Sequence, residues 1–456
     1  MDSSPILVMT AILTIASSDS GFFWHITDFH YDFTYHDRQL SCNPNAKPTH
    51  PGQFGDFWCD SPWKLVNSSV HAMAKLKQNA DFILWTGDTV LHASDSDLNY
   101  DVNAAIHKNT TDLIKSVLPG VHVYASFGNH DYWPNNQFPP ANNRLYNDTL
   151  ERWGPWINDS SQDNYFRKGA YYTVKTPQGL RIISLNTNLY YTSDKETVNV
   201  SDPADQLQWL NATLVNAKTS NEKVLITAHI SPGVHTPSSI LWMHEKFHTP
   251  LVDILQTHAD IIVGMFFGHD HSDGFKVLPD KTGTSMAPIF IAPSVTPWRY
   301  VIPNEIGPAH NPGIRLVEYD RTTGRPLDIT QYYLDLKTAN QNATDNWEVE
   351  YEAKKDYEIP DLTAATLAKL ASKIKDPGSK EFKNYWRFYT VSAPTEMLEA
   401  CVNDCHSAVY CGLTFFDMDS FRACQNKMIS GSSQLFSVGR MMTTFVTSGL
   451  LIAIAL

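Results

Sequence analysis

The sequence of 456 residues is poor in basic side chains, in paired-cysteine motifs and in repeats. Lys and Arg number 35 against 48 Asp and Glu, which gives a formal net charge of −13. A protein scaffold for nucleic acid needs a basic face, so this balance argues against that class of partner and leaves nucleotides open as small substrates. None of the six cysteines forms a C-x-x-C pair, which disfavours a thiolate zinc site. With 42% hydrophobic and 18% charged residues, the chain is globular and long enough for one large domain and a smaller one.

The chain opens on an apolar segment, residues 6–16. Ala16-x-Ser18 supplies small residues at a cleavage point, so we expect residues 1–18 to form a signal peptide of the secretory pathway. No Lys or Arg precedes the apolar segment, which departs from the usual signal, and a short buried first strand is the alternative.

The end of the chain follows a second pattern. Small residues at Ser430–Ser433 are followed by a spacer up to Arg440 and by an apolar terminus over residues 441–456. This order predicts a GPI-attachment signal over residues 431–456, which is removed and leaves the protein at the extracellular face of the plasma membrane, with secretion as a further route. The apolar terminus is shorter than the ~20 residues that span a bilayer, which disfavours the alternative of a tail-anchored helix.

Cysteines and glycosylation sequons fit a secreted chain. The even number of cysteines predicts three disulfides, and proximity in sequence favours Cys42–Cys59 and two bridges, of open pairing, among Cys401, Cys405, Cys411 and Cys424. Seven N-x-[ST] sequons are candidate glycosylation sites: Asn67, Asn109, Asn147, Asn158, Asn199, Asn211 and Asn342.

From residue 22 onward, short apolar-rich segments alternate with longer helical patterns. The expected strands are Phe22–Thr27, Phe82–Thr86, Val121–Ser126, Ile182–Asn186, Val224–Ala228 and Ile261–Phe267. The expected helices between them include Leu65–Gln78, Ala104–Val117 and Gln206–Ala217. Further strands are expected near Pro288–Ala292, Ile314–Tyr319 and Ile329–Leu334. This alternation predicts an α/β domain with much parallel pairing.

The strand signals stop around Ala339–Tyr351. Amphipathic helices are expected at Leu362–Ile374 and Lys380–Tyr389, and the cysteine-rich segment follows them. We therefore expect a main α/β domain over residues 22–340 and a small, disulfide-linked helical subdomain over residues 345–428.

Polar side chains follow five of the expected strands at the point where each strand ends. In chain order these side chains are Asp28 and His30, then Asp88, then Asn129 and His130, then His229, and finally His269 and His271 of the block Gly268-His269-Asp270-His271. The carboxyl ends of strands in an open α/β sheet are where ligands bind, so we expect these side chains to meet at one edge.

The chemistry that suits these residues is a pair of metal ions. Imidazole, carboxylate and amide oxygen are ligands for zinc, iron or manganese. Asp88 carries two oxygens and is the candidate bridge between two ions. Two metals about 3.5–4 Å apart can clamp a phosphoryl centre and activate a water molecule. His130 stands next to Asn129 and would face the leaving group as a general acid.

The blocks D-x-H, G-D, G-N-H-D, a lone His and G-H-x-H resemble those of the calcineurin-like metallophosphoesterases. More narrowly, the chain is similar to the acid sphingomyelinase-like phosphodiesterases, and most to their membrane-anchored b-type branch. The blocks that carry this narrower resemblance are Asp60-Ser61-Pro62-Trp63, Phe82–Asp88, Leu185–Tyr191 and Thr296-Pro297-Trp298. The resemblance covers about residues 22–428. It implies a catalytic domain over residues 22–340, built as a sandwich of two mixed sheets flanked by helices.

The resemblance also implies the cofactor and the roles of the site residues. It implies two Zn²⁺ per chain, one held by Asp28, His30, Asp88 and His271, and one held by Asp88, Asn129, His229 and His269. His130 matches the acid that protonates the leaving group. His92 matches a second active-site histidine near the scissile phosphate.

Two departures narrow the expected activity. Leu91 stands three residues after Asp88, where purple acid phosphatases have a metal-binding Tyr, so an iron-tyrosinate phosphatase is disfavoured. Acid sphingomyelinase carries a saposin-like domain ahead of its catalytic domain, whereas the first expected strand here begins soon after the expected signal peptide. This favours soluble phosphodiesters over sphingomyelin.

We therefore expect a metal-dependent phosphoric diester hydrolase, tethered to the membrane by a GPI anchor and acting as a monomer. Its expected substrate is a small phosphodiester of the nucleotide or lipid head-group type. The alternative is a non-catalytic surface protein that keeps the fold to bind lipid or to modulate signalling. Loss of a ligand would favour that alternative, but all seven ligand positions are intact.

Overall fold

The computed structural model describes residues 19–279, 282, 285–302 and 305–430. The expected signal peptide over residues 1–18 and the expected GPI-attachment signal over residues 431–456 lie outside these ranges. Among the described residues, no helix combines the length and the apolar character that crossing a membrane requires.

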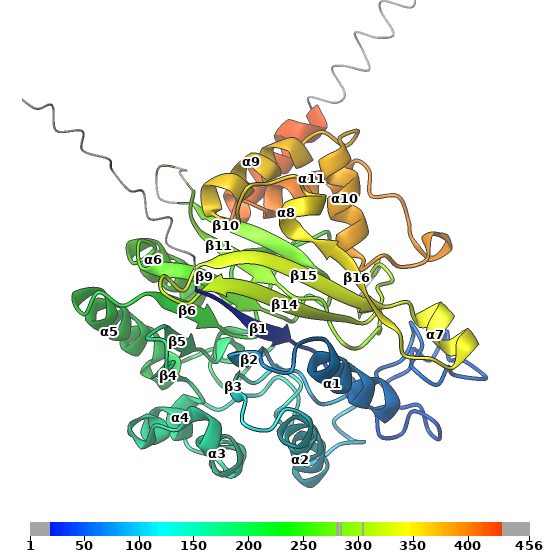
Figure 1. The fold of residues 1–456 in the computed structure, drawn as a ribbon, viewed down its shortest axis with the longest axis horizontal. Coiled ribbons are helices and arrows are strands. Elements are labelled where there is room, and N and C mark those ends of the chain that lie inside the picture. Colours follow the sequence, from blue (N-terminus) through cyan, green and yellow to red (C-terminus); the bar gives the residue numbers. More distant parts are fainter. Residues whose placement is uncertain (1–18, 280–281, 283–284, 303–304, 431–456) are drawn as a thin grey trace, which may run out of the picture.

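Two six-stranded mixed sheets form the frame of the fold (Figure 1). The first sheet has the order β16-β15-β14-β1-β2-β3, in which β1, β2 and β3 are parallel and the others pair antiparallel. The bounds of its strands are β1 (Ser20–Ile26), β2 (Phe82–Trp85), β3 (His122–Ala125), β14 (Gly313–Asp320), β15 (Pro326–Leu334) and β16 (Trp347–Glu352).

The second sheet has the order β10-β11-β9-β6-β5-β4, in which β11, β9, β6 and β5 are parallel. Its strands are β4 (Tyr172–Lys175), β5 (Arg181–Ser184), β6 (Val224–Thr227), β9 (Ile262–Phe267), β10 (Gly274–Pro279) and β11 (Ser285–Ile291). Two short hairpins pair β7 (Val234–His235) with β8 (Ile240–Leu241), and β12 (Val301–Ile302) with β13 (Glu305–Ile306).

Helices flank the two sheets (Figure 1). Up to residue 342 they are α1 (Trp63–Lys77), α2 (Tyr100–Val117), α3 (Arg144–Ile157), α4 (Asp163–Gly169), α5 (Gln206–Thr219), α6 (Glu245–Thr257) and α7 (Leu336–Asn342). Towards the C-terminus they are α8 (Ala353–Asp356), α9 (Ala364–Ile374), α10 (Lys380–Tyr389) and α11 (Asp404–Gly412). α9 and α10 pack against the outer strands β10 and β11 of the second sheet.

The hydrophobic core lies between the sheets and under the helices. Side chains alternate in direction along a strand, and β1 follows this rule. Phe23 meets Phe266 of β9 edge to face, with ring centroids 5.2 Å apart. Its neighbour Trp24 points the other way and donates from Nε1 to the carbonyl of Lys77 in α1. β1 therefore contributes one face to the contact between the sheets and the other to the contact with α1.

The fold expectation is confirmed for both sheets, and one detail of it is wrong. Strand β16 lies where we expected strand signals to stop, and it pairs antiparallel with β15 at the edge of the first sheet. Its apolar residues Trp347 and Tyr351 are buried, while Val349 is 50% exposed. The first sheet therefore continues past residue 345, into the stretch that we expected to be helical.

The three expected disulfides are present. Cys42 pairs with Cys59, and the four C-terminal cysteines pair as Cys401–Cys405 and Cys411–Cys424. The asparagines of all seven sequons are half-buried or exposed, as attachment of a glycan requires.

Candidate metal centre

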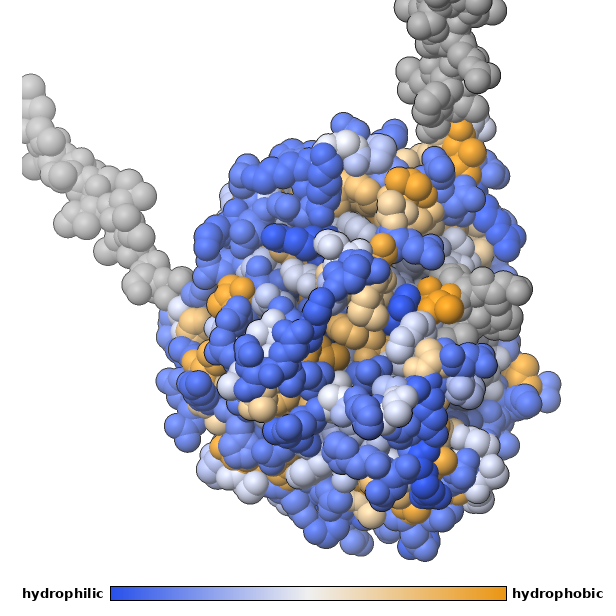
Figure 2. Space-filling model, turned by 90° about the vertical axis from the view of Figure 1, so that its right-hand side faces the viewer, coloured by the Kyte–Doolittle hydropathy of each residue, from blue (hydrophilic) through white to orange (hydrophobic). Residues whose placement is uncertain are grey.

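The seven expected ligand residues come together between the two sheets. The parallel strands β1, β2 and β3 and the parallel strands β6 and β9 end at the same edge, and the polar loops follow them. β1 points to the right in Figure 1, and Figure 2 views the molecule from that side. Three overlapping groups have ligand atoms within 4.8 Å of one another: His30, His92 and His271; Asp88, His229 and His269; Asp28, His30 and Asp88.

One half of the site surrounds Asp28. Its Oδ1 lies 3.7 Å from Nε2 of His30 and 3.5 Å from Nε2 of His271. Its Oδ2 accepts hydrogen bonds from Thr27 Oγ1 and from the backbone N–H of His269. Asp28 thus orients one oxygen toward two imidazoles and uses the other to bind the first loop to the last.

The other half of the site surrounds His229. Its Nε2 lies 3.0 Å from Oδ1 of Asn129 and 3.2 Å from Nδ1 of His269. The amide nitrogen of Asn129 donates to Oδ1 of Asn136, which turns the amide oxygen toward His229. Asp88 joins the halves, because its Oδ2 lies 3.1 Å from Nε2 of His229 and 3.4 Å from Nε2 of His30.

Backbone carbonyls set the orientation of the imidazoles. Nδ1 of His30 lies 2.7 Å from the carbonyl of Val90, and Nδ1 of His229 lies 2.7 Å from that of Thr86. A carbonyl can only accept, so Nδ1 carries the proton in both rings. In the neutral form of each ring, Nε2 then keeps the lone pair that a metal ligand needs.

Burial keeps most of these imidazoles neutral. It lowers the pKa of His30 to about 3, and it lowers the pKa values of His269 and His271 well below the usual range. His229 differs: burial opposes its charge, but the adjacent Asp88 carboxylate raises its pKa. Neutral imidazole and ionised carboxylate are the forms that bind metal ions.

Two of the converging atoms lack a hydrogen-bond partner. Among the described residues, Oδ1 of Asp28 and Nε2 of His30 are buried and accept or donate no hydrogen bond. Buried polar atoms are nearly always paired, and leaving two unpaired in one place is costly. The cluster therefore fits cations, which these lone pairs would coordinate.

The backbone of the site is held in an uncommon conformation. Five of the seven ligand-type residues have positive φ angles: Asp28 (50°), His30 (40°), Asp88 (53°), His269 (70°) and His271 (58°). Such values are rare outside glycine and cost free energy, and they gather at functional sites.

Two glycines of the motifs allow the loops to approach. A Cβ at Gly128 would lie 2.1 Å from Oδ1 of Asp88, and a Cβ at Gly268 would lie 2.0 Å from Oγ1 of Thr27. Any side chain at these two positions would therefore displace an acid or its support.

His130 and His92 flank the metal-ligand cluster. The backbone N–H of His130 donates to Oδ1 of Asp88, and its ring centroid lies 4.3 Å from that of His92. Burial lowers the pKa values of both rings. Both side chains line a cleft of about 270 Å³ together with Tyr191, Trp242, Trp298 and Tyr300.

Residues that the sequence analysis did not assign complete the site. Asp131 accepts hydrogen bonds from the backbone N–H groups of Gly128, Asp88 and Thr89, and so holds the second loop against the third. Asp131 belongs to the G-N-H-D block, which could have drawn attention to it, but the spacing of the block does not predict a structural or catalytic role for it. Asp60 and Trp298 contact His92 and lie in blocks noted above only for resemblance.

Comparisons with known proteins agree with this geometry. Residues 23–273 match the family described as calcineurin-like phosphoesterase, and residues 284–430 match the acid sphingomyelin phosphodiesterase C-terminal region. The chain is 36% identical over 427 residues to acid sphingomyelinase-like phosphodiesterase 3b of Mus musculus, which covers 92% of each chain. It is 38% identical over 417 residues to the cyclic GMP-AMP phosphodiesterase SMPDL3A of Homo sapiens, with 90% of each chain covered.

A third relative, sphingomyelinase phosphodiesterase C of Dictyostelium discoideum, is 32% identical over 439 residues, which is 92% of this chain and 96% of the relative. These matches run through both sheets and the C-terminal helices, and the two family matches leave residues 274–283, which include β10, between them. Together with the buried His and Asp clusters, they show a metal-dependent phosphodiesterase fold with its metal-binding groups intact. The chain belongs to the acid sphingomyelinase-like phosphodiesterases of the calcineurin-like phosphoesterase superfamily.

Proposed function

We propose that this chain is a cell-surface phosphodiesterase that works with two zinc ions. Asp28, His30, Asp88 and His271 would hold one ion, and Asp88, Asn129, His229 and His269 would hold the other. The observation that carries this proposal is the position of one Asp88 oxygen between His30 and His229. When bound, two zinc ions supply Lewis-acid stabilisation of phosphoryl charge and activation of water.

His130 is the proposed acid for the leaving group. Its backbone N–H is fixed on Asp88, which places the residue directly beside the metal-ligand cluster. Its side chain lines the cleft, where it can meet a leaving group. The ring of His92 packs against that of His130 and lines the same cleft. We propose that His92 contacts the phosphate.

The proposed substrates are small phosphodiesters of the nucleotide or lipid head-group type. The cleft is about 270 Å³ and is lined by aromatic side chains, among them Tyr191, Trp242 and Tyr300. This size suits a small ligand, and aromatic walls suit a nucleobase or an apolar part of a head group. One relative is a cyclic GMP-AMP phosphodiesterase by name, and another is acid sphingomyelinase-like, which supports both substrate types.

The proposed location is the extracellular face of the plasma membrane, through a GPI anchor. Three disulfides and the accessible sequon asparagines support an oxidising, secretory route. The anchor itself rests on residues 431–456, which lie outside the described ranges.

The function is tested with purified ectodomain, residues 19–430, and a panel of a cyclic dinucleotide, a nucleotide–choline diester and sphingomyelin in detergent. We expect hydrolysis of at least one soluble diester, loss of that activity with a chelator and recovery with zinc. Hydrolysis of none of the three, by a folded and zinc-loaded ectodomain, would favour the non-catalytic alternative.

A further inference from the structure

We propose that Asp60 is the positioning residue of His92, an inference that rests on the proposed function of this site. Asp60 is fully buried, and its Oδ2 accepts from the backbone N–H of His92 at 2.6 Å. Its Oδ1 lies 2.9 Å from Nδ1 of the His92 ring. The carboxylate therefore binds both the main chain and the side chain of one residue.

This double contact determines how the His92 ring is presented. Its Nδ1 faces a carboxylate, which accepts a hydrogen bond, so Nδ1 carries a proton and Nε2 remains for the cleft. The ring stacks between His30 and Trp298, with centroids 3.9 Å and 3.8 Å away. Stacking fixes the plane of the ring, but a half turn about the Cβ–Cγ bond would exchange Nδ1 with Cδ2 and keep the same plane. The contact between Nδ1 and Asp60 selects one of these two orientations.

Asp60 is itself held by a rigid frame. Its backbone N–H donates to Oγ of Ser41, and Oγ1 of Thr296 donates to its Oδ1. Ser41 donates onward to Asp32, and its carbonyl accepts from Nε1 of Trp298. One residue, Ser41, therefore holds both Asp60 and the aromatic ring that stacks on His92.

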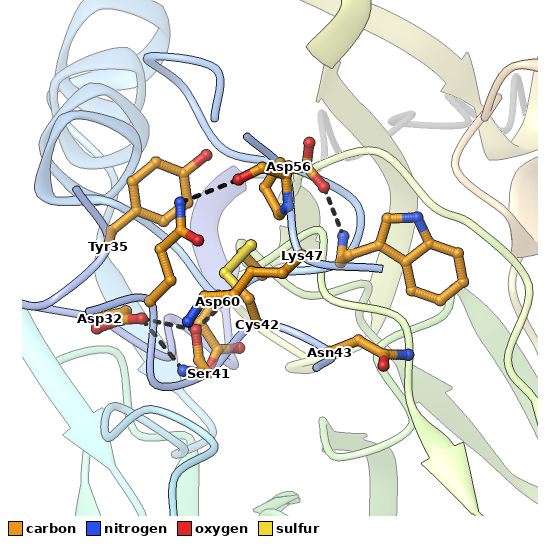
Figure 3. Close-up of a disulfide and its surroundings, with 12 residues drawn as sticks. Asp32, Tyr35, Ser41, Cys42, Asn43, Lys47, Asp56 and Asp60 are labelled. Atoms are coloured by element: carbon orange, nitrogen blue, oxygen red, sulfur yellow. Dashed lines mark hydrogen bonds between the residues drawn. A yellow bond between two sulfur atoms is a disulfide. The ribbon is translucent and has the colours of Figure 1, made fainter. Parts of the chain in front are cut away.

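A disulfide closes this frame. Cys42 follows Ser41 and Cys59 precedes Asp60, and the two cysteines are bonded (Figure 3). Figure 3 shows Asp32, Ser41 and Asp60 gathered around this bond. The covalent link thus fixes the distance between the two residues that support the His92–Trp298 stack. Asp60 is absent from the residues that line the cleft, so it acts through His92 and not on the substrate.

The competing explanation is that Asp60 only stabilises the loop between Asp88 and His92. A double-mutant cycle separates the two explanations, because a positioning residue has no effect once the residue that it positions is gone. The variants are Asp60→Asn, His92→Ala and both together, made in the ectodomain of residues 19–430. The measurements are kcat/KM on the best soluble diester of the panel and zinc content.

We expect Asp60→Asn to lower kcat/KM by about 10–100-fold, the usual effect of removing an outer partner of a site residue. In the His92→Ala background the same substitution should change kcat/KM by less than about twofold. Zinc content should match the wild type in all variants. Asp56→Asn is the matched control, since Asp56 lies on the same loop and its side chain accepts a hydrogen bond from the backbone N–H of Trp58, outside the site. It should leave kcat/KM unchanged.

Equal losses from Asp60→Asn in both backgrounds would overturn the inference, as would a loss of zinc in Asp60→Asn or full activity of His92→Ala. These results leave the proposed function standing, because the wild type remains active. An inactive, zinc-loaded wild type overturns the proposed function, and the inference with it. If Asp60→Asn does not fold, Ser41→Ala replaces it in the same cycle, with a smaller expected loss and the same criterion.

Discussion

Oδ2 of Asp88 lies 3.1 Å from Nε2 of His229, and both side chains are buried. Asp88 follows a strand of the first sheet, whereas His229 follows a strand of the second. The contact therefore joins loops from different sheets at one point. The candidate metal centre therefore depends on how the two sheets pack.

Asp88→Asn should lose metal and activity together. The amide keeps the shape of the side chain but removes the charge that a bridging ligand supplies. We expect zinc to fall from about two ions per chain to about one or fewer, with phosphodiesterase activity lost to the same extent. Elemental analysis checks this, with the exposed Asp112→Asn as a control that should keep both. If Asp88→Asn binds as much zinc as the wild type, Asp88 does not bridge the two ions.

His130→Ala should separate chemistry from metal binding. General-acid catalysis contributes about 10²–10⁴-fold, so turnover of an ester with a poor leaving group should fall by that order. An ester of p-nitrophenol needs little protonation and should suffer much less, while zinc content stays at the wild-type value. Paired kinetics on the two esters check this. If turnover of the two esters falls by the same factor, His130 is not the general acid, and His92 becomes the better candidate.

Gly128→Ala should disrupt the site without altering any ligand. The added Cβ would lie 2.1 Å from Oδ1 of Asp88, so the carboxylate must move. We expect loss of zinc together with a lower midpoint of thermal unfolding. Gly154→Ala is the matched control, because no atom lies within 4 Å of its Cβ and the residue sits inside α3. There the substitution should leave zinc content at the wild-type value. If Gly128→Ala binds as much zinc as the wild type, the loops can accommodate the added Cβ without moving Asp88 out of the site.

The anchor prediction concerns the full-length chain on cells. Phosphatidylinositol-specific phospholipase C should release the protein into the medium, because the expected signal over residues 431–456 is exchanged for a GPI anchor. The mature protein should then lack the C-terminal apolar residues by mass spectrometry. A protein that stays on the membrane and retains Leu456 is instead tail-anchored.

Much of this architecture is readable from the sequence, for a physical reason. The buried strands β1, β2, β6 and β9 are short apolar runs, and each is followed at once by polar residues that a parallel sheet brings to one edge. The edge strand β16 was missed because glutamates alternate with its apolar residues and Val349 is half exposed, which weakens the signal of a buried strand.

The supporting residues could not be found in the same way. Asp60 lies 32 residues before His92, and no spacing rule links a carboxylate to a ring over that distance. Asp131 serves backbone N–H groups, which every residue has, so no partner marks it in the sequence. Such contacts depend on how loops fold back, and only the structure shows them.

The most direct test is zinc analysis of the purified wild-type ectodomain, coupled to activity on a soluble phosphodiester. We expect about two zinc ions per chain, loss of both ions and of activity after chelation, and recovery of activity as the second equivalent of zinc is restored. A preparation that contains no metal and retains full phosphodiesterase activity would contradict the two-metal centre.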